Sequence, residues 1–244
     1  MTDLVYAVGD IHGRFDLLTK AIEWIESDSD GQPHTVVFLG DYIDRGPQSK
    51  EVLNTLIAGP TKYKSEWVCL QGNHESMMTQ CFRNEARWEW WFANGGGQTL
   101  QSYGAVDGEK FDAHRIVPKR TLDWMLSRPL YYIHDFDPYP FIFVHAGLDH
   151  SETLAEQRHK TLMWKRYPPI ASNDDVEAQR EHVGGFFHAN QFHVVVHGHT
   201  PNTNNPRWFG SFRLNIDSGA VSTNRLTVLR ISDYLQLKAI VGEQ

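Results

Sequence analysis

Five short apolar runs, each followed by a polar residue that can bind a metal, constrain the fold of this chain more than any other feature. The runs span residues 4–8, 36–39, 67–70, 141–144 and 194–196. They are too short for helices and rich in β-branched and aromatic residues, a composition typical of buried strands. The polar residues that follow them are Asp10, Asp41, Asn73, His145 and His199. Because ligands of open α/β sheets bind beyond the carboxyl ends of the strands, we expect these side chains to meet in one site.

Apolar residues at helical spacing follow each of the first three runs. The first set is Phe15, Leu18, Ile22 and Ile25, and similar sets fall within residues 52–57 and 77–82. This alternation predicts an α/β sheet with helices packed against it. Segments 213–216, 226–231 and 234–241 are expected to form the successive strands of a meander.

No stretch of the chain reads as a linker between domains, so residues 1–244 are predicted to form one domain. The polar segment 167–185 contains Pro168 and Pro169 and predicts a loop or short helices.

Composition excludes several classes of protein. The chain is 41% hydrophobic and 22% charged, which is typical of a folded domain, and it has no apolar run of about 18 residues that could span a membrane. The net charge of −7 argues against general binding of nucleic acid or of anionic membranes. Only Cys69 and Cys81 occur, and no signal peptide is visible, so we expect a cytoplasmic protein. The oligomeric state is left open.

Thirteen histidines point to a metal or acid–base site. His12 lies two residues beyond Asp10, so the strand ends offer two carboxylates, one amide and three imidazoles. These donors suit Mn, Fe or Zn, and six of them are more than one metal needs when water must also bind. Two metals that share a carboxylate are therefore expected. The neutral ligands leave such a site positively charged, which attracts phosphate.

At this point the motifs can be compared with a known family. Residues 9–13 (GDIHG), 40–46 (GDYIDRG) and 72–75 (GNHE) resemble the signature blocks of the calcineurin-like metallophosphatases. They look most like the phosphoprotein phosphatase branch, and within it the bacteriophage lambda-type and bacterial serine/threonine phosphatases. Residues 145–147, 198–200, 94–97, 164–166 and 216–221 extend the likeness. The resemblance implies a central β-sandwich flanked by helices (αββα), with a dinuclear site at the carboxyl ends of the strands.

The resemblance also implies a role for each residue. Metal one would be held by Asp10, His12 and Asp41, and metal two by Asp41, Asn73, His145 and His199, with Asp41 as the bridge. The expected metal is Mn²⁺, with Fe or Zn as alternatives. A hydroxide shared by two metals needs no protein nucleophile.

Proton transfer and phosphate binding fall to other residues in the same resemblance. His74, paired with Asp44, would be the general acid for the leaving group. Arg45 and Arg166 would bind the phosphate.

The function predicted first is a phosphomonoesterase that acts on phosphoserine and phosphothreonine, and also on phosphotyrosine as an open possibility, in a protein or peptide. The alternative is a dinucleoside tetraphosphate hydrolase from a sister group. In the resemblance, Asp44, Glu75 and Thr200 favour the protein phosphatases. Pro201 counts against the nuclease and cyclic-nucleotide phosphodiesterase branches, which usually carry a histidine there. A metal-free binding scaffold is a remote alternative, because all six ligands are intact.

Several further residues are interpreted as structural. His197 is expected to pack or hydrogen-bond, and the aromatic cluster at 88–92 to pack rather than to line a substrate groove. Asn94 and the three glycines after it predict a tight loop with positive φ. Asp217 is expected either to form a turn or to orient a site residue.

Overall fold

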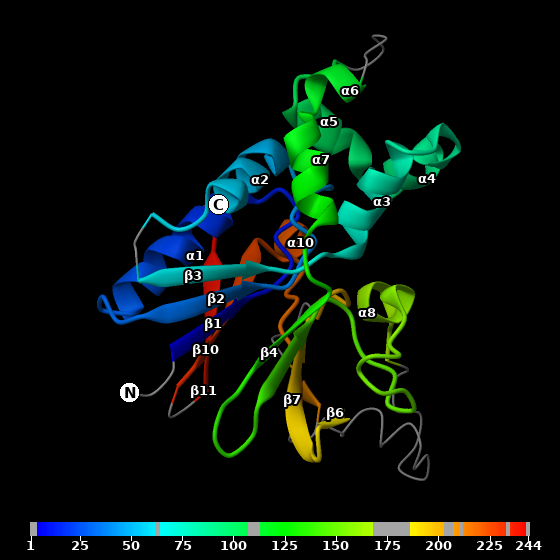
Figure 1. Cartoon of the computed structure of the whole chain (residues 1–244). Helices are drawn as coiled ribbons and strands as arrows, with labels where there is room; N and C mark the ends of the chain where they lie inside the picture. Colours follow the sequence, from blue (N-terminus) through cyan, green and yellow to red (C-terminus); the bar gives the residue numbers. More distant parts are fainter. Residues whose placement is uncertain are drawn as a thin grey trace.

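The computed structural model describes residues 4–61, 64–106, 113–167, 186–202, 207–209, 212–232 and 235–242. Its strands form two sheets (Figure 1). The first sheet has the order β11-β10-β1-β2-β3, whose strands span Leu235–Val241, Arg225–Ile231, Leu4–Val8, His34–Phe38 and Ser65–Cys69. Strands β1, β2 and β3 run parallel, so their carboxyl ends meet at one edge of the sheet.

The second sheet has the order β4-β5-β7-β9-β8. Its strands span Tyr131–His134, Phe141–Val144, Gln191–His197, Arg213–Asn215 and Arg207–Phe209, and β6 (Phe186–His188) pairs with β7. Strands β5, β7 and β9 are parallel, so this sheet also gathers several carboxyl ends at one edge.

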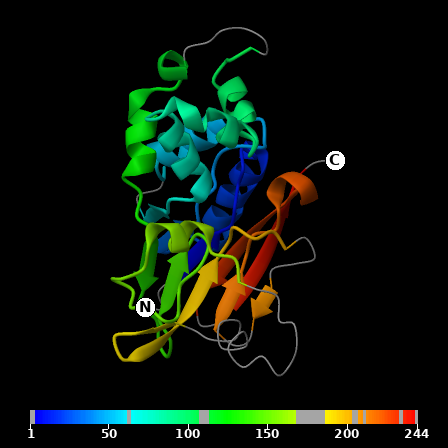
Figure 2. The same cartoon turned by 90° about the vertical axis from the view of Figure 1, so that its right-hand side faces the viewer.

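The helices lie on the outer faces and at one end of the two sheets (Figures 1 and 2). They are α1 (Phe15–Asp28), α2 (Ser49–Ala58), α3 (Asn73–Cys81), the 3₁₀ helix η1 (Glu85–Arg87), α4 (Trp88–Phe92), α5 (Gly96–Ser102), α6 (Ala113–Ile116), α7 (Lys119–Leu126), α8 (His159–Trp164) and α10 (Ala220–Thr223). Helices α3 to α7 gather above the carboxyl ends of the first sheet (Figure 1).

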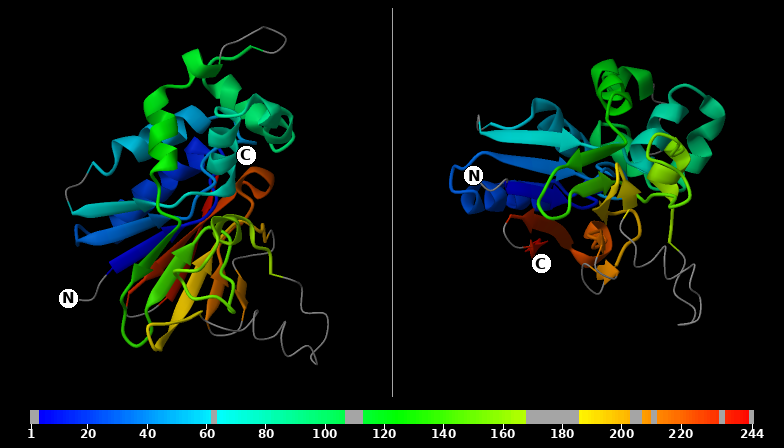
Figure 3. Two further views of the ribbon diagram at one scale, coloured as in Figure 1. Left: turned by 45° about the vertical axis from the view of Figure 1, so that its right-hand side comes forward. Right: turned by 60° about the horizontal axis from the view of Figure 1, so that its bottom comes forward.

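Successive residues of the buried strands face different cores, because side chains alternate across a strand. In β1, Tyr6 packs against the helices and Ala7 packs between the two sheets. In β7, Val196 packs between the sheets while Val195 packs on the outer face with Leu162 of α8. The layers are therefore helix, sheet, sheet and helix (Figure 3), which confirms the predicted αββα architecture.

The three strands predicted at the C-terminal end form, and the last two pair as a meander requires, but the placement of the first is wrong. Strand β9 pairs in parallel with β7 in the second sheet, whereas β10 and β11 form an antiparallel pair in the first. The chain passes from one sheet to the other between the end of β9 and the start of β10. Leu214 of β9 and Leu229 of β10 face the same core from opposite sheets. Residues 168–185, where a loop or short helices are predicted, lie outside the described residues. No helix in the described part of the chain is long and apolar enough to cross a membrane.

Candidate metal centre

The strand ends of both sheets bring the predicted ligands together. Loops after β1 and β2 carry Asp10, His12 and Asp41, Asn73 begins α3 just after β3, and loops after β5 and β7 carry His145 and His199. All six side chains are buried. Among the described residues, two groups could each hold a metal ion: His12, Asp41 and His74, and Asp41, His145 and His199. Asp41 belongs to both groups, which is the position the sequence predicts for the bridging carboxylate.

Hydrogen bonds hold two of the histidines in the form that binds a metal. Nδ1 of His12 lies 2.8 Å from the carbonyl oxygen of Ile43, and Nδ1 of His145 lies 2.9 Å from that of Leu39. A carbonyl only accepts, so each Nδ1 donates and each Nε2 keeps its lone pair. Burial lowers the pKa of His12 to about 3 and lowers that of His145 as well, which keeps both rings neutral.

The side-chain oxygen of Asn73 lies close to ring nitrogens of two candidate ligands. Its Oδ1 lies 2.9 Å from Nε2 of His145 and 2.9 Å from Nδ1 of His199. Burial, with His145 nearby, lowers the pKa of His199 to about 3. A carboxamide oxygen that faces neutral ring nitrogens is an arrangement that a cation satisfies, so the donor set fits a divalent metal.

Asp10 carries an unsatisfied oxygen at the same edge. Its Oδ2 accepts a hydrogen bond from the backbone of His199 at 3.0 Å, but its buried Oδ1 has no hydrogen-bond partner. Burial and the neighbouring Asp217 carboxyl raise the pKa of Asp10, and burial raises that of Asp217 to about 6. Two buried carboxyls without a cation are costly, which also fits a metal ligand at Asp10. Oδ1 of Asp217 accepts from the backbone of Gly219, so this residue forms a turn as well as facing Asp10.

His74 differs from the three other histidines of the site. Its Nδ1 donates to Oδ2 of Asp44 at 2.6 Å. Burial alone would lower the pKa of His74, but Asp41 and the Asp44 hydrogen bond outweigh burial and raise it. The protonated ring is therefore favoured at this one position, as a general acid requires. Nε2 of His74 lies 3.9 Å from Oδ2 of Asp41, so the same atom also faces the candidate metal group.

Asp44 is held in place by three donors from distant parts of the chain. Besides His74, Trp91 donates its Nε1 to Oδ2 at 2.8 Å, and Thr99 donates its hydroxyl to Oδ1 at 2.6 Å. Asp44 is fully buried, so these bonds replace the water that the carboxylate loses on folding. Of the aromatic cluster, Trp91 packs inside as the sequence indicates, and its indole N–H also orients the His74 pair.

The two candidate phosphate-binding arginines are both exposed to solvent. Arg45 donates from Nη1 to Nε2 of His12 at 2.9 Å, and its Nη2 lies 3.0 Å from Nε2 of His74, which can accept only while that ring is neutral. Arg166 follows α8, and its charge contributes to lowering the pKa of His199. The structure therefore places the Arg45 guanidinium beside the candidate ligands, and the charge of Arg166 acts on one of them, His199.

Backbone strain is concentrated in the same loops. His12, Asp41, Asp44, Arg45 and His199 all have positive φ, from 47° to 73°. Non-glycine residues rarely adopt this conformation, and they cluster at functional sites when they do. Gly95 has a φ of 99° and its carbonyl accepts from the backbone of Arg45, so the predicted tight loop also positions that arginine.

Glu75 has a structural role that the sequence does not reveal. Its carboxylate accepts hydrogen bonds from the backbone N–H groups of Asp41, Tyr42 and Gly72, at 2.9, 2.8 and 3.0 Å. It thereby ties the loop after β2 to the loop after β3. The motif contained Glu75, but only the fold shows what its carboxylate contacts.

We use the name reaction centre for the six candidate ligands together with His74 and Asp44. His197 is not part of it, in agreement with the packing or hydrogen-bonding role expected from the sequence. Its Nδ1 lies 3.1 Å from the carbonyl oxygen of Gly198, and its Nε2 accepts from buried Arg213 at 3.1 Å.

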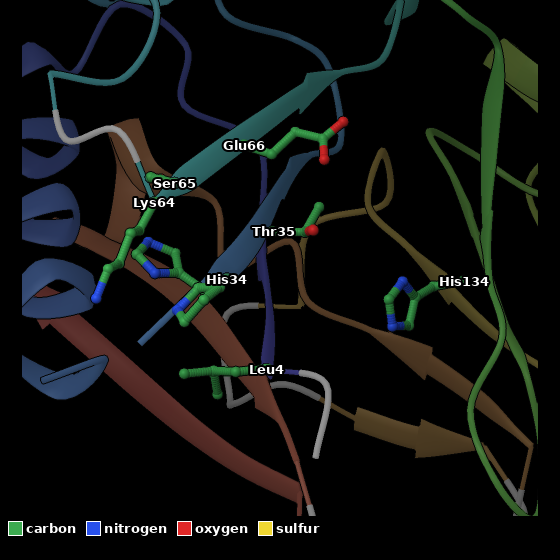
Figure 4. A pocket seen from close by; sticks show the side chains of 8 residues that line it. Leu4, His34, Thr35, Lys64, Ser65, Glu66 and His134 are labelled. Carbon is green, nitrogen blue, oxygen red and sulfur yellow. The ribbon is translucent and has the colours of Figure 1, made fainter. Parts of the chain in front are cut away.

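A separate pocket of about 430 Å³ lies at the opposite, amino-terminal ends of the strands (Figure 4). Its lining includes Leu4, His34, Lys64, Glu66 and His134. None of the predicted site residues lines it, so it takes no part in the site described above.

Comparison with known proteins defines the class. The family model of the calcineurin-like phosphoesterases matches residues 4–202. The chain therefore belongs to the calcineurin-like phosphoesterase family, and it is a hydrolase with His/Asp groups that could bind metal.

Two similar bacterial proteins share one name. A bis(5′-nucleosyl)-tetraphosphatase PrpE (asymmetrical) from Anoxybacillus flavithermus is 29% identical over 231 residues, covering 91% of this chain and 88% of the relative. The protein of the same name from Bacillus thuringiensis is 28% identical over 242 residues, with the same coverage.

Solved structures show the same fold. A candidate diadenosine tetraphosphatase has a TM-score of 0.66 at 16% identity, covering 100% of this chain and 96% of that one. A serine/threonine phosphatase from Saccharomyces cerevisiae has a TM-score of 0.60 at 16% identity, covering 99% and 81%.

The names of the relatives support the alternative function better than the protein phosphatase predicted first. The structure explains why two of the residues used to separate the branches do not decide the question. Asp44 holds His74, and Glu75 holds the loops of the ligands. Both contacts organise the candidate ligands and His74, and neither residue contacts the part of a substrate that differs between a phosphate ester and a tetraphosphate.

Proposed function

We propose that the chain is a metal-dependent hydrolase of bis(5′-nucleosyl) tetraphosphates. The observation that carries this proposal is the similarity, over 91% of the chain, to relatives named for that activity. The buried donor set supports it, because with two divalent ions bound its neutral imidazole and amide ligands would leave the site positively charged, and such a site attracts a highly anionic substrate. We infer that Asp10, His12, Asp41, Asn73, His145 and His199 are the metal ligands.

In this proposal the six ligands would hold two divalent ions, with Mn²⁺ as the expected metal, and the bound ions would supply an activated water and neutralise charge on the phosphoryl group. Arg45 and Arg166 would bind oxygens of that group. His74 faces the leaving oxygen with Nε2 and gives it a proton, while Asp44 fixes the ring through Nδ1.

Hydrolysis of a phosphoserine or phosphothreonine protein is the second candidate. The His74–Asp44 pair favours it, because the alkoxide of serine is far more basic than a polyphosphate and needs a proton to leave. The pair is compatible with both substrates but is required more strongly by the ester.

A side-by-side assay tests the proposal. The Mn²⁺-loaded protein is given a bis(5′-adenosyl) tetraphosphate, a phosphoserine peptide and nitrophenyl phosphate, and kcat/KM is compared. We expect the tetraphosphate to give the highest value. A higher value for the phosphopeptide would replace the proposal with the second candidate.

A further inference from the structure

We propose that a pocket beside His199 binds the nucleobase of the nucleotide that is cleaved, and so directs hydrolysis to the phosphorus attached to that nucleoside. This inference rests on the proposed function, because it names how that substrate is held. The pocket has a volume of about 630 Å³. We call it the tryptophan pocket, and the lining residues used here are Ser76, Gln80, Arg87, Trp90, Lys160 and Trp164.

Two indole rings from different helices form its aromatic wall. Trp90 of α4 and Trp164 of α8 have ring centroids 5.7 Å apart and planes 23° apart. Trp90 is 37% exposed, so part of this aromatic wall is accessible to a ligand. Base stacking on exposed aromatic rings changes affinity by roughly 5- to 100-fold and is the main sequence-tolerant way in which proteins hold a nucleobase. The chemistry of this wall therefore fits a purine or pyrimidine.

Polar and basic groups surround the aromatic wall. Arg87 lies with its Cζ 5.9 Å from the centre of the Trp90 ring, and Lys160 lines the other side from α8. On a chain of net charge −7, two cations at the rim of one pocket favour an anionic chain of phosphates. At the floor, the amide of Gln80 donates to the hydroxyl of Ser76 at 2.9 Å. A carboxamide carries both a donor and an acceptor, which suits the edge of a base.

The position of the pocket fixes which phosphate reaches the reaction centre. The Trp164 ring lies 6.1 Å from the ring of His199, edge to face. Ser76 lies two residues after His74 on α3. In α4, Trp91 donates to Asp44 while its neighbour Trp90 lines the pocket. The pocket therefore lies beside the reaction centre, and we infer that the phosphorus bonded to a seated nucleoside is the one that reaches it.

A nucleoside seated in the tryptophan pocket thus presents its own phosphorus for attack. Water adds its oxygen to that phosphorus, and the bond to the bridging oxygen breaks. The electron pair leaves with the bridging oxygen, which takes a proton from His74, and a proton from the attacking water restores His74. The products are a nucleoside monophosphate from the seated half and a nucleoside triphosphate from the other half, which agrees with the word asymmetrical in the relatives' names.

The kinetic test uses Trp90→Ala with bis(5′-adenosyl) tetraphosphate and nitrophenyl phosphate. We expect KM for the tetraphosphate to rise roughly 10- to 100-fold, with kcat/KM for nitrophenyl phosphate unchanged. Trp90→Phe keeps a stacking surface and should recover most of the loss. Trp24→Phe on α1, which contacts Tyr6 far from the pocket, is the matched control. Equal changes on both substrates, or no change on either, would overturn the proposal.

A binding test keeps this inference separate from the proposed function. Inhibition of nitrophenyl phosphate hydrolysis by adenosine 5′-monophosphate is compared with inhibition by inorganic phosphate, in the wild type and Trp90→Ala. We expect the variant to weaken only the nucleotide. If the wild type does not cleave the tetraphosphate but shows this selective effect, the proposed function fails and the nucleobase site stands. If both inhibitors respond alike, the site is wrong even where the tetraphosphate is cleaved.

The products provide the final check on position. In water enriched in heavy oxygen, the label should enter the nucleoside monophosphate and not the triphosphate. Two nucleoside diphosphates as products would show that water attacks the second phosphorus from the nucleoside. That result would contradict binding of the nucleobase in the tryptophan pocket.

Discussion

The reaction centre and the tryptophan pocket touch each other but are built in opposite ways. In the reaction centre the side chains are buried, several backbones are strained, and His74 and Asp44 are fixed by hydrogen bonds from distant residues. In the pocket, Trp90, Arg87 and Lys160 are exposed, and stacking between rings is the main contact of its wall.

This difference separates the chemistry from the choice of substrate. Rigid, buried groups are needed where charge develops on a phosphoryl group, because misplacing them loses electrostatic stabilisation. An exposed aromatic wall can change without disturbing them. The reaction centre therefore matches the family at large, and the pocket is where we expect a tetraphosphatase to differ from a protein phosphatase.

Removing the metals should have the largest effect and should not distinguish the two regions. We expect a chelator to abolish activity on every substrate and Mn²⁺ to restore it, because the buried donor set fits divalent ions. The measurement is activity against metal content per chain. Full activity in metal-stripped protein without added metal would refute the metal centre.

Asp41→Asn should cost activity by roughly 10³-fold or more, because one carboxylate serves both groups of candidate ligands. Elemental analysis should show that both metals are lost. Asp16→Asn, which alters an ion pair of α1 with Arg14, is the control and should keep both metals. Two metals per chain in the Asp41 variant would contradict its role as the bridge.

His74→Asn should lower kcat by roughly 10²–10⁴-fold while the metals stay bound. The loss should be greater on a phosphoserine peptide than on nitrophenyl phosphate, because nitrophenolate leaves with little need of a proton. Equal losses, with chemistry rate-limiting, would assign His74 to positioning instead. Loss of metal would make it a ligand, consistent with its place beside His12 and Asp41.

Trp91→Phe should lower kcat by roughly 10-fold, because it removes one of the donors that orient Asp44. KM should change little, since this indole is buried away from the tryptophan pocket. Together with Trp90→Ala, this variant tests whether the reaction centre and the tryptophan pocket are independent. The Trp91 variant should change mainly kcat, and the Trp90 variant should change mainly KM. A shared effect on both constants would show that the two regions are not independent.

Lys160→Ala should have the smallest effect, a rise of less than about 3-fold in KM for the tetraphosphate, because exposed charges are screened by water and salt. The rise should vanish at high ionic strength. A salt-independent change would mean that Lys160 binds the substrate through a more buried contact.

The sequence predicts the strand ends well because each motif follows a buried strand, and parallel strands deliver their ends to one edge. It does not predict the support of Asp44, since Trp91 and Thr99 lie 47 and 55 residues away and neither is part of a recognisable motif with it. The sequence assigns β9 to the wrong sheet, because a short apolar strand that precedes a hairpin has the same alternation of apolar residues in either sheet. Leu214 is buried in the core that both sheets share, so its burial does not reveal which strand β9 pairs with.

The carboxylate of Glu75 has a thermodynamic consequence. By holding the backbones of Asp41, Tyr42 and Gly72 at once, it makes two loops move as one unit. Ordering a free loop costs conformational entropy at every residue, and a ligand that orders it loses that much affinity. In this chain the Glu75 hydrogen bonds order both loops when the protein folds, so a cation that binds there would lose less affinity to the ordering of the loops.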